Sequence, residues 1–105
     1  MDAVSKSSCL MELSADGHIL SANERMQNAL GYGLADLVGK HESHIQFDED
    51  IRAQTHIDLW RTLREHHPVN IEIRRKGVGG LECWFLANFS PILGLDGILT
   101  KIIIQ

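Results

Sequence analysis

Hydrophobic and polar positions alternate at both ends of this chain, and between those ends they follow a helical spacing. Near the start, the runs "SCLMELS" and "HILSA" flank Asp16 and Gly17, a pair that favours tight hairpin turns because both residues tolerate positive φ. Near the end, the glycine turns "KGVGG" and "GLDG" separate the runs "VNIEIRR", "LECWFLANF" and "ILTKIIIQ". The pattern predicts two strands, several helices and then three strands.

Two short helices are predicted directly after the first hairpin. Asn23 supplies a side-chain oxygen for the free amides of a first helical turn, and Gly31 suits the left-handed cap that ends a helix. The segment 34–39, "LADLVG", predicts a second helix with its three large apolar residues on one side. Asn23 therefore marks the change from extended to helical backbone.

A longer helix is predicted over residues 48–64. Acidic residues fill its first turn and arginines its last, which matches the helix dipole at both ends. The spacing i, i+3, i+4, i+7 places one stripe toward the core, formed by His56, Leu59, Trp60 and Leu63. Pro68 ends any continuation. Hairpins and meanders separated by helices predict one antiparallel sheet with helices on a single face, an α+β domain.

Composition narrows the class of partner. The 105 residues are 44% hydrophobic and 23% charged, which fits one domain over 1–105, and a net charge of -4 argues against nucleic-acid and anionic-membrane partners. No apolar run approaches the roughly 18 residues that span a bilayer. Cys9 and Cys83 lack the spacing of a disulfide framework, which indicates a reduced, cytoplasmic setting. The final β-branched run ends without a turn, so we expect the domain to come from a longer signalling protein.

Several stretches together resemble a PAS domain over nearly the whole chain. They are "ADGHILSAN", "ALGYGLADLVGKH", "LWRTLRE" and "KGVGGLECWFLANFSPILGLDG". The order and spacing are similar to PAS modules of bacterial chemotaxis and aerotaxis receptors. The resemblance implies a five-stranded sheet in the order 2-1-5-4-3, helices wrapped over one face, and a ligand pocket between them.

Strand parity then assigns the two faces of that sheet. Glu82 belongs outside, so residues 83, 85, 87 and 89 face the helices. By the same alternation the inward set that would line the pocket includes Met11, Ile71, Ile73 and Phe85. The outward set includes the apolar residues Leu10, Trp84, Leu86 and Ile103. Such a patch predicts a homodimer surface or a covering segment, whereas scattered exposed hydrophobes are the alternative. Similar PAS domains dimerise through this face and signal to an output domain in the same chain.

Haem is the first cofactor to weigh, because an axial ligand needs an imidazole on an apolar wall. His56 lies on the buried stripe, similar to the ligand position of oxygen-sensing haem kinases of this family. His41 and His44 are similar to the histidine of haem-containing chemotaxis receptors. Arg75 shares parity with Ile71 and could reach a bound gas or carboxylate; the alternative is an arginine in solvent. Each histidine is otherwise a core or loop residue.

Flavin is less expected than haem, and a ligand-free domain is a further alternative. Trp60 matches a tryptophan of flavin-binding aerotaxis receptors, but "IQFDED" replaces the stretch expected beside it, and Trp60 is otherwise a core residue. Photochemical flavin domains need a reactive cysteine in the helical segment, whereas both cysteines here are predicted to be strand residues.

Catalytic and metal motifs are not expected. "GVGG" precedes a strand, unlike the phosphate loops that open a helix, and the acids at 48–50 lack calcium-loop spacing. We therefore expect a non-enzymatic sensor, with a ligand-free dimerisation spacer as the alternative.

Overall fold

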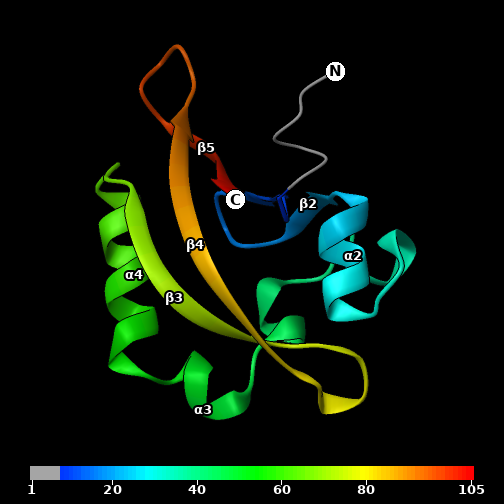
Figure 1. Ribbon diagram of the computed structural model, residues 1–105. Coiled ribbons are helices and arrows are strands. Elements are labelled where there is room, and N and C mark those ends of the chain that lie inside the picture. The colour runs from blue at the N-terminus through cyan, green and yellow to red at the C-terminus, as the bar shows by residue number, and fades with distance from the viewer. Residues whose placement is uncertain (1–7) are drawn as a thin grey trace.

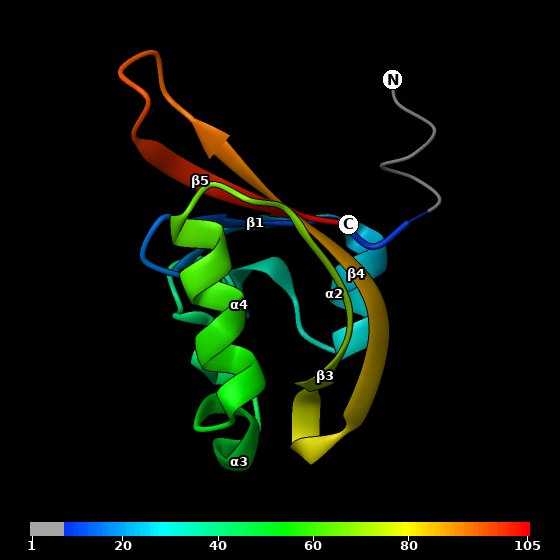
Figure 2. The same ribbon diagram turned by 90° about the vertical axis from the view of Figure 1, so that its left-hand side faces the viewer.

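The computed structural model describes residues 8–105 and contains the five-stranded antiparallel sheet that the sequence predicts. Its strand order is β2-β1-β5-β4-β3. The strands are β1 (Met11–Ser14), β2 (Ile19–Ala22), β3 (Val69–Lys76), β4 (Glu82–Leu93) and β5 (Leu99–Ile104). The helices are α2 (Glu24–Leu30), α3 (Asp48–Ile51) and α4 (Gln54–Arg64), with short 3-10 segments η1 (Leu34–Asp36), η2 (Glu42–Ile45) and η3 (Val78–Gly80). Figure 1 shows the long β3–β4 hairpin, and Figure 2 shows the helices gathered on one side of the sheet.

Local chemistry sets the first hairpin and helix where the sequence predicts them. Gly17 adopts φ 89° in the β1–β2 turn, and a Cβ there would lie 2.8 Å from His41 Nε2, so the position favours glycine twice over. The Asn23 side chain accepts a hydrogen bond from the Met26 amide at 2.9 Å. Gly31 ends α2 in the left-handed conformation.

The two other helical predictions need correction. The predicted helix 48–64 is two helices, because the chain turns to extended backbone at Ala53 before α4 begins. The break lets α3 pack at the edge of β3, where Asp50 pairs with Arg74, while α4 packs on the core. In the segment 34–39 only the 3-10 turn η1 forms; Leu37, which follows it, is buried, whereas Leu34 and Val38 are exposed.

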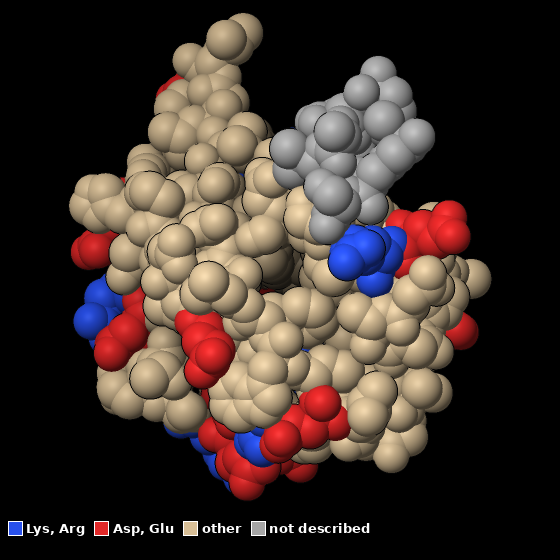
Figure 3. Space-filling model, viewed as in Figure 1, with Lys and Arg blue, Asp and Glu red and all other residues tan. Residues whose placement is uncertain are grey.

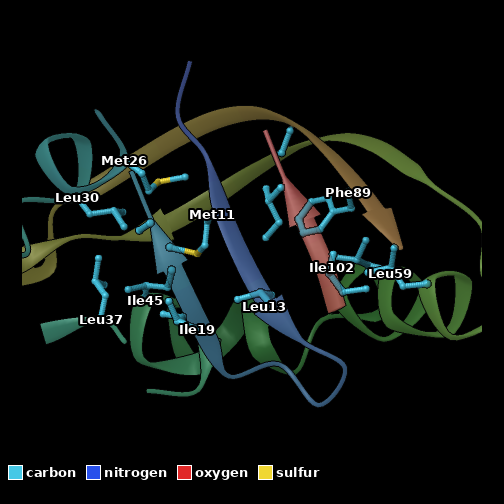
Figure 4. Packing of buried hydrophobic residues seen from close by; sticks show 14 of the residues in the cluster. Met11, Leu13, Ile19, Met26, Leu30, Leu37, Ile45, Leu59, Phe89 and Ile102 are labelled. Carbon is cyan, nitrogen blue, oxygen red and sulfur yellow. The ribbon is translucent and has the colours of Figure 1, made fainter. Parts of the chain in front are cut away.

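The core lies between the inner face of the sheet and the helices, as the strand alternation predicts. Figure 4 shows side chains of β1, β4 and β5 packed with those of α2 and α4. The predicted stripe of α4 is on this side, with Leu59, Trp60 and Leu63 buried. The buried apolar residues are Met11, Leu13, Ile19, Ala22, Met26, Leu30, Leu37, Ile45, Leu59, Trp60, Leu63, Ala87, Phe89, Ile102 and Ile104. Ile71, Ile73, Cys83 and Phe85 are half-buried against them.

The outward apolar residues do not form one continuous patch. Trp84 and Leu86 are 58% and 77% exposed, whereas Leu10 and Ile103 are half-buried. Ile103 pairs with Ser90 of β4, six positions along that strand from Trp84. The pairing of β4 with the end of the chain continues only to Asn88, which exchanges two backbone hydrogen bonds with Gln105, so Trp84 and Leu86 lie on the part of β4 that extends past it. The continuous surface expected from parity is therefore divided by the strand register.

Candidate functional site

A group of polar side chains lies inside the domain, and Glu42 is at its centre. Glu42 is 1% exposed, although it comes from the short segment η2. Its Oε1 accepts a hydrogen bond from Trp60 Nε1 of α4 at 2.5 Å, and its Oε2 lies 3.5 Å from Arg75 NH2 of β3. His56 Nε2 lies 3.8 Å from the same Oε1. We call Glu42, Gln46, His56, Trp60 and Arg75 the polar cluster.

Backbone contacts hold η2, and with it Glu42, against the first hairpin. The Glu42 amide donates to the Gly17 carbonyl at 2.8 Å, and His41 forms an isolated bridge with His18. The His41 side chain caps η2 by accepting from the Ser43 amide. The hairpin turn thereby holds the backbone of Glu42, while α4 and β3 meet at its carboxylate.

Burial and neighbouring charges shift the pKa values of Arg75 and His56, the two basic members of the polar cluster. Desolvation lowers the pKa of Arg75, and the nearby Glu42 carboxylate opposes that effect. Desolvation also lowers the pKa of His56, again against Glu42, while the charge of Arg75 adds to the lowering. His56 is therefore a neutral imidazole at physiological pH, and the acid of the cluster is balanced by the arginine.

A cavity of about 670 Å³ opens between α4 and β3 beside the polar cluster. This volume falls in the range of about 300–1,000 Å³ that holds small molecules. Its apolar wall comes from Leu59 of α4 and from Val69, Ile71 and Ile73 of β3. Gln46, His56 and Arg75 form its polar part, and Asp50, Thr55, Asp58, Thr62, Glu72, Arg74 and Trp84 complete the lining. We call this space the α4–β3 cavity.

One arginine links the helical side of the α4–β3 cavity to the sheet. Arg74 contacts Asp50 of α3 through Nε at 2.8 Å and NH2 at 2.9 Å, and it contacts Glu82 of β4 at 3.0 Å. Its guanidinium also lies 4.3 Å from the centre of the Phe47 ring. These bonds raise the pKa of Arg74 and lower the pKa of Glu82. In Figure 3, charged side chains gather at the lower rim of the view, in the region of α3.

A second, smaller cavity of about 320 Å³ lies between α2 and the part of β4 that extends past β5. Met26 of α2 and Phe85 of β4 are on its walls, together with Cys9. Ile73 and Arg75 border both cavities, so the polar cluster lies between them. A movement of the Arg75 side chain would therefore change the walls of both cavities.

Comparison with known proteins identifies the family. A family model described as the PAS fold matches residues 5–104. The chain belongs to the PAS family. This PAS domain is 33% identical, over 98% of its length, to the biofilm dispersion protein BdlA of Pseudomonas aeruginosa. It spans about a quarter of the length of that relative, as 25% of BdlA is covered.

Solved structures confirm the fold of the PAS domain. The PAS-B domain of Drosophila melanogaster Cycle with bound ethylene glycol matches with a TM-score of 0.81 at 14% identity, covering 93% of this chain and 96% of that one. The LOV protein of Rhodobacter sphaeroides matches with a TM-score of 0.81 at 17% identity, covering 97% of this chain and 61% of that one. Both identities are low, so these likenesses concern architecture alone.

The predicted histidines of the PAS domain lie in different environments. His56 borders the α4–β3 cavity, with its side chain 18% exposed. His41 is exposed, and its Nε2 lies 3.1 Å from the Asp16 carbonyl. His44 is exposed, with its ring 5.5 Å from that of Tyr32. Only one of the three is therefore brought to the cavity.

These positions do not fit haem ligation. The Nδ1 atom of His56 is hydrogen bonded to Gln46 at 3.2 Å, and its Nε2 is turned toward the Glu42 carboxylate. Both nitrogens of His56 therefore face polar partners, which an iron atom would have to displace. Within residues 8–105, no group of three or more His, Cys, Asp or Glu residues is placed to hold a metal ion. Haem stays a prediction that the side-chain positions do not support.

The remaining predicted site residues are placed on the inner side. Arg75 points inward and is 7% exposed, so the alternative of a solvated strand-end arginine is wrong. Ile71 and Ile73 border the α4–β3 cavity, whereas Met11 and Phe85 border the smaller one. Burial raises the pKa of both Cys9 and Cys83, which makes each thiol less reactive. Cys83 is in β4 as predicted, whereas Cys9 lies just before β1 and not in a strand; neither is in a helix.

Sequence reasoning missed Glu42 and Gln46, the two members of the polar cluster that come from the segment between the first hairpin and α3. Both lie in a loop-like stretch whose local pattern is polar, and such residues are usually solvated. One signal was available: Arg75 shares inward parity with Ile71, and a buried arginine requires an acidic partner.

No helix within residues 8–105 is long and apolar enough to cross a membrane.

Proposed function

We propose that this PAS domain is a non-catalytic sensory module that binds a small molecule in the α4–β3 cavity and passes the change to an attached output domain. The observation that carries the proposal is the position of the cavity beside the polar cluster. Any ligand there touches side chains whose partners come from η2, α4 and β3. Membership of the PAS family supports the sensory role, and two free cysteines without a disulfide favour a reduced, cytoplasmic setting.

The switch follows from competition for the polar cluster. A ligand biases a two-state protein only through its different affinity for the two states. Arg75 is held by one bond of 3.5 Å to Glu42 and one of 3.3 Å to its neighbour's carbonyl, both at the long end for hydrogen bonds. A bound molecule that draws on Gln46 or Arg75 changes this balance, and β3 transmits the change through its register with β4.

The test compares the small molecules bound by the wild-type protein with those bound by a variant whose α4–β3 cavity is filled by a larger side chain. Ile71→Trp places a large ring in the α4–β3 cavity, and Ile57→Trp is the matched control because Ile57 is exposed on the same helix that faces the cavity. Each full-length protein is purified and denatured, and the released material is analysed by mass spectrometry. The wild type and the control should release a small molecule that is absent from Ile71→Trp. Equal amounts in all three proteins would contradict the proposal.

The second candidate is a ligand-free spacer that dimerises through the outer face. Exposed Trp84 and Leu86 favour it, since large apolar side chains close together are typical of contact surfaces. Replacing both with serine should convert a dimer to a monomer in sedimentation analysis, while Leu95→Ser, at an exposed hairpin tip, should not. A wild-type monomer at all concentrations would exclude the spacer.

A further inference from the structure

The two cavities of the domain differ in the charges on their walls. The α4–β3 cavity is bordered by the acids Asp50, Asp58 and Glu72 as well as by two arginines. The smaller cavity, which we call the α2–β4 cavity, is bordered by Arg25 and Arg75, and none of its described wall residues is acidic. Its volume of about 320 Å³ is enough for a small organic molecule. Figure 3 shows the surface hollowed between the regions of β4 and α2. The charges of the α2–β4 cavity therefore favour a negatively charged occupant.

Arg25 is a cation of this wall whose charge is not compensated. It is exposed, lies on α2 and borders the cavity. It forms no ion pair with a described residue. Its charge also acts on Cys9, another residue of the wall, where it opposes the rise in pKa that burial of the thiol causes. The positive charge of Arg25 thus reaches the α2–β4 cavity without a described acid to balance it.

Arg75 is the buried cation of the same wall, at 7% exposure. An arginine carries five N–H donors. Here NH1 donates to the Arg74 carbonyl at 3.3 Å, and NH2 donates to Glu42 Oε2 at 3.5 Å. The Nε atom of Arg75 has no partner among the described residues and keeps some accessible surface. Glu42 borders neither cavity, so it balances Arg75 from behind the wall. Arg75 therefore has donors left for a ligand while its contact with Glu42 remains.

We infer that the α2–β4 cavity is a second binding site, for a small carboxylate with an apolar body. The carboxylate pairs with Arg25 and Arg75, and the apolar body packs on Met11, Met26 and Phe85. A cation is repelled by the two arginines, and a neutral molecule of the same shape lacks the stronger, charge-assisted hydrogen bonds. This site is separate from the α4–β3 cavity, so the inference goes beyond the proposed function and does not depend on it.

Three matched probes test the preference for a carboxylate. Hydrocinnamate is an aromatic carboxylate, hydrocinnamamide is its neutral amide, and phenylpropylamine is a cation with the same phenyl chain. Binding to the ¹⁵N-labelled chain is followed by amide chemical shifts. Hydrocinnamate should shift signals of α2 and of residues 84–87 in β4. It should bind about tenfold more tightly than hydrocinnamamide, because hydrogen bonds to charged groups are stronger than neutral ones, and phenylpropylamine should bind weakest.

Variants show whether the preference depends on the wall of the α2–β4 cavity. Arg25→Gln removes an exposed charge and should weaken hydrocinnamate binding about fivefold, with the amide unaffected. Arg64→Gln makes the same change of net charge at an exposed residue of α4 that borders neither cavity, so it should not weaken binding. Ile71→Trp fills the α4–β3 cavity and should leave hydrocinnamate binding intact, because Ile71 borders that cavity and not the smaller one. Thermal unfolding of each variant checks that it is folded.

The outcomes separate this inference from the proposed function. The second site is overturned if hydrocinnamate binds no more tightly than its amide, if α2 and β4 show no shifts, or if Arg25→Gln and Arg64→Gln weaken binding equally. None of these results affects the α4–β3 cavity. Loss of hydrocinnamate binding in Ile71→Trp would place the anion in the α4–β3 cavity, which contradicts the second site and supports the proposed function. A carboxylate preference that only Arg25→Gln reduces supports the α2–β4 site.

Discussion

Replacing Glu42 with glutamine should destabilise the domain far more than the loss of one surface acid. The change keeps the shape and a hydrogen-bond acceptor for Trp60, but it removes the charge that balances Arg75. Both partners are buried, at 1% and 7% exposure, so the arginine is left as an uncompensated charge. Breaking a buried pair by removing one partner costs about 3–5 kcal/mol, and the retained acceptor places Glu42→Gln near the lower end, about 3 kcal/mol.

Arg75→Met should cost a similar amount, because it leaves Glu42 buried without a positive partner. The double variant Glu42→Gln with Arg75→Met has neither isolated charge. We expect its loss of stability to be smaller than the sum of the two single losses by at least about 2 kcal/mol, since neighbouring residues of one network are not additive. This non-additivity distinguishes a buried ion pair from two residues that each fill space.

Urea unfolding followed by circular dichroism at neutral pH measures these differences. Asp58→Asn is the matched control, because Asp58 pairs with Arg61 at 2.7 Å but both side chains are more than half exposed. Exposed pairs contribute about 0–1 kcal/mol, so the control should stay close to wild type. A loss for Glu42→Gln no larger than that of Asp58→Asn would refute the placement of a charged pair inside the domain.

Three further predictions concern the helices and pH. Asn23→Ala should lower the free energy of unfolding by about 1 kcal/mol, because α2 loses its N-terminal cap at the Met26 amide. Exposed Asn28→Ala on the same helix should change it little, and equal urea midpoints for the two variants would contradict this. Arg74→Met should speed amide hydrogen exchange in α3 but not in α4, since the bonds that hold α3 to the sheet edge are lost; unchanged exchange would disprove that role. The lowered pKa of His56 means that, between that pKa and the ordinary value of 6.5, the unfolded chain binds more protons than the folded one, so stability falls as pH drops through 6.5. His56→Gln should flatten that part of the stability–pH curve measured by urea unfolding, and parallel curves would be inconsistent with a buried imidazole.

Local sequence determined the strands, the first helix and the two faces of the sheet. The Asp16–Gly17 turn, the Asn23 cap and the alternation from Cys83 to Phe89 each depend on neighbours a few residues away. These features depend on local backbone preference and on the two-residue period of side chains along a strand, and both can be predicted from the sequence. The family resemblance supplied the strand order, which local patterns cannot give.

The tertiary structure alone decided where the long helix breaks and which polar residues are buried. Nothing local in "DIRAQTH" predicts extended backbone at Ala53; the break accompanies the contact of Asp50 with Arg74, which is 24 positions away. Glu42 likewise looks like a surface acid until Trp60 and Arg75, 18 and 33 positions along the chain, are brought to it. Burying a charge is favourable only when partners from distant elements meet it, so the polar cluster exists only once the sheet and helices have closed around it.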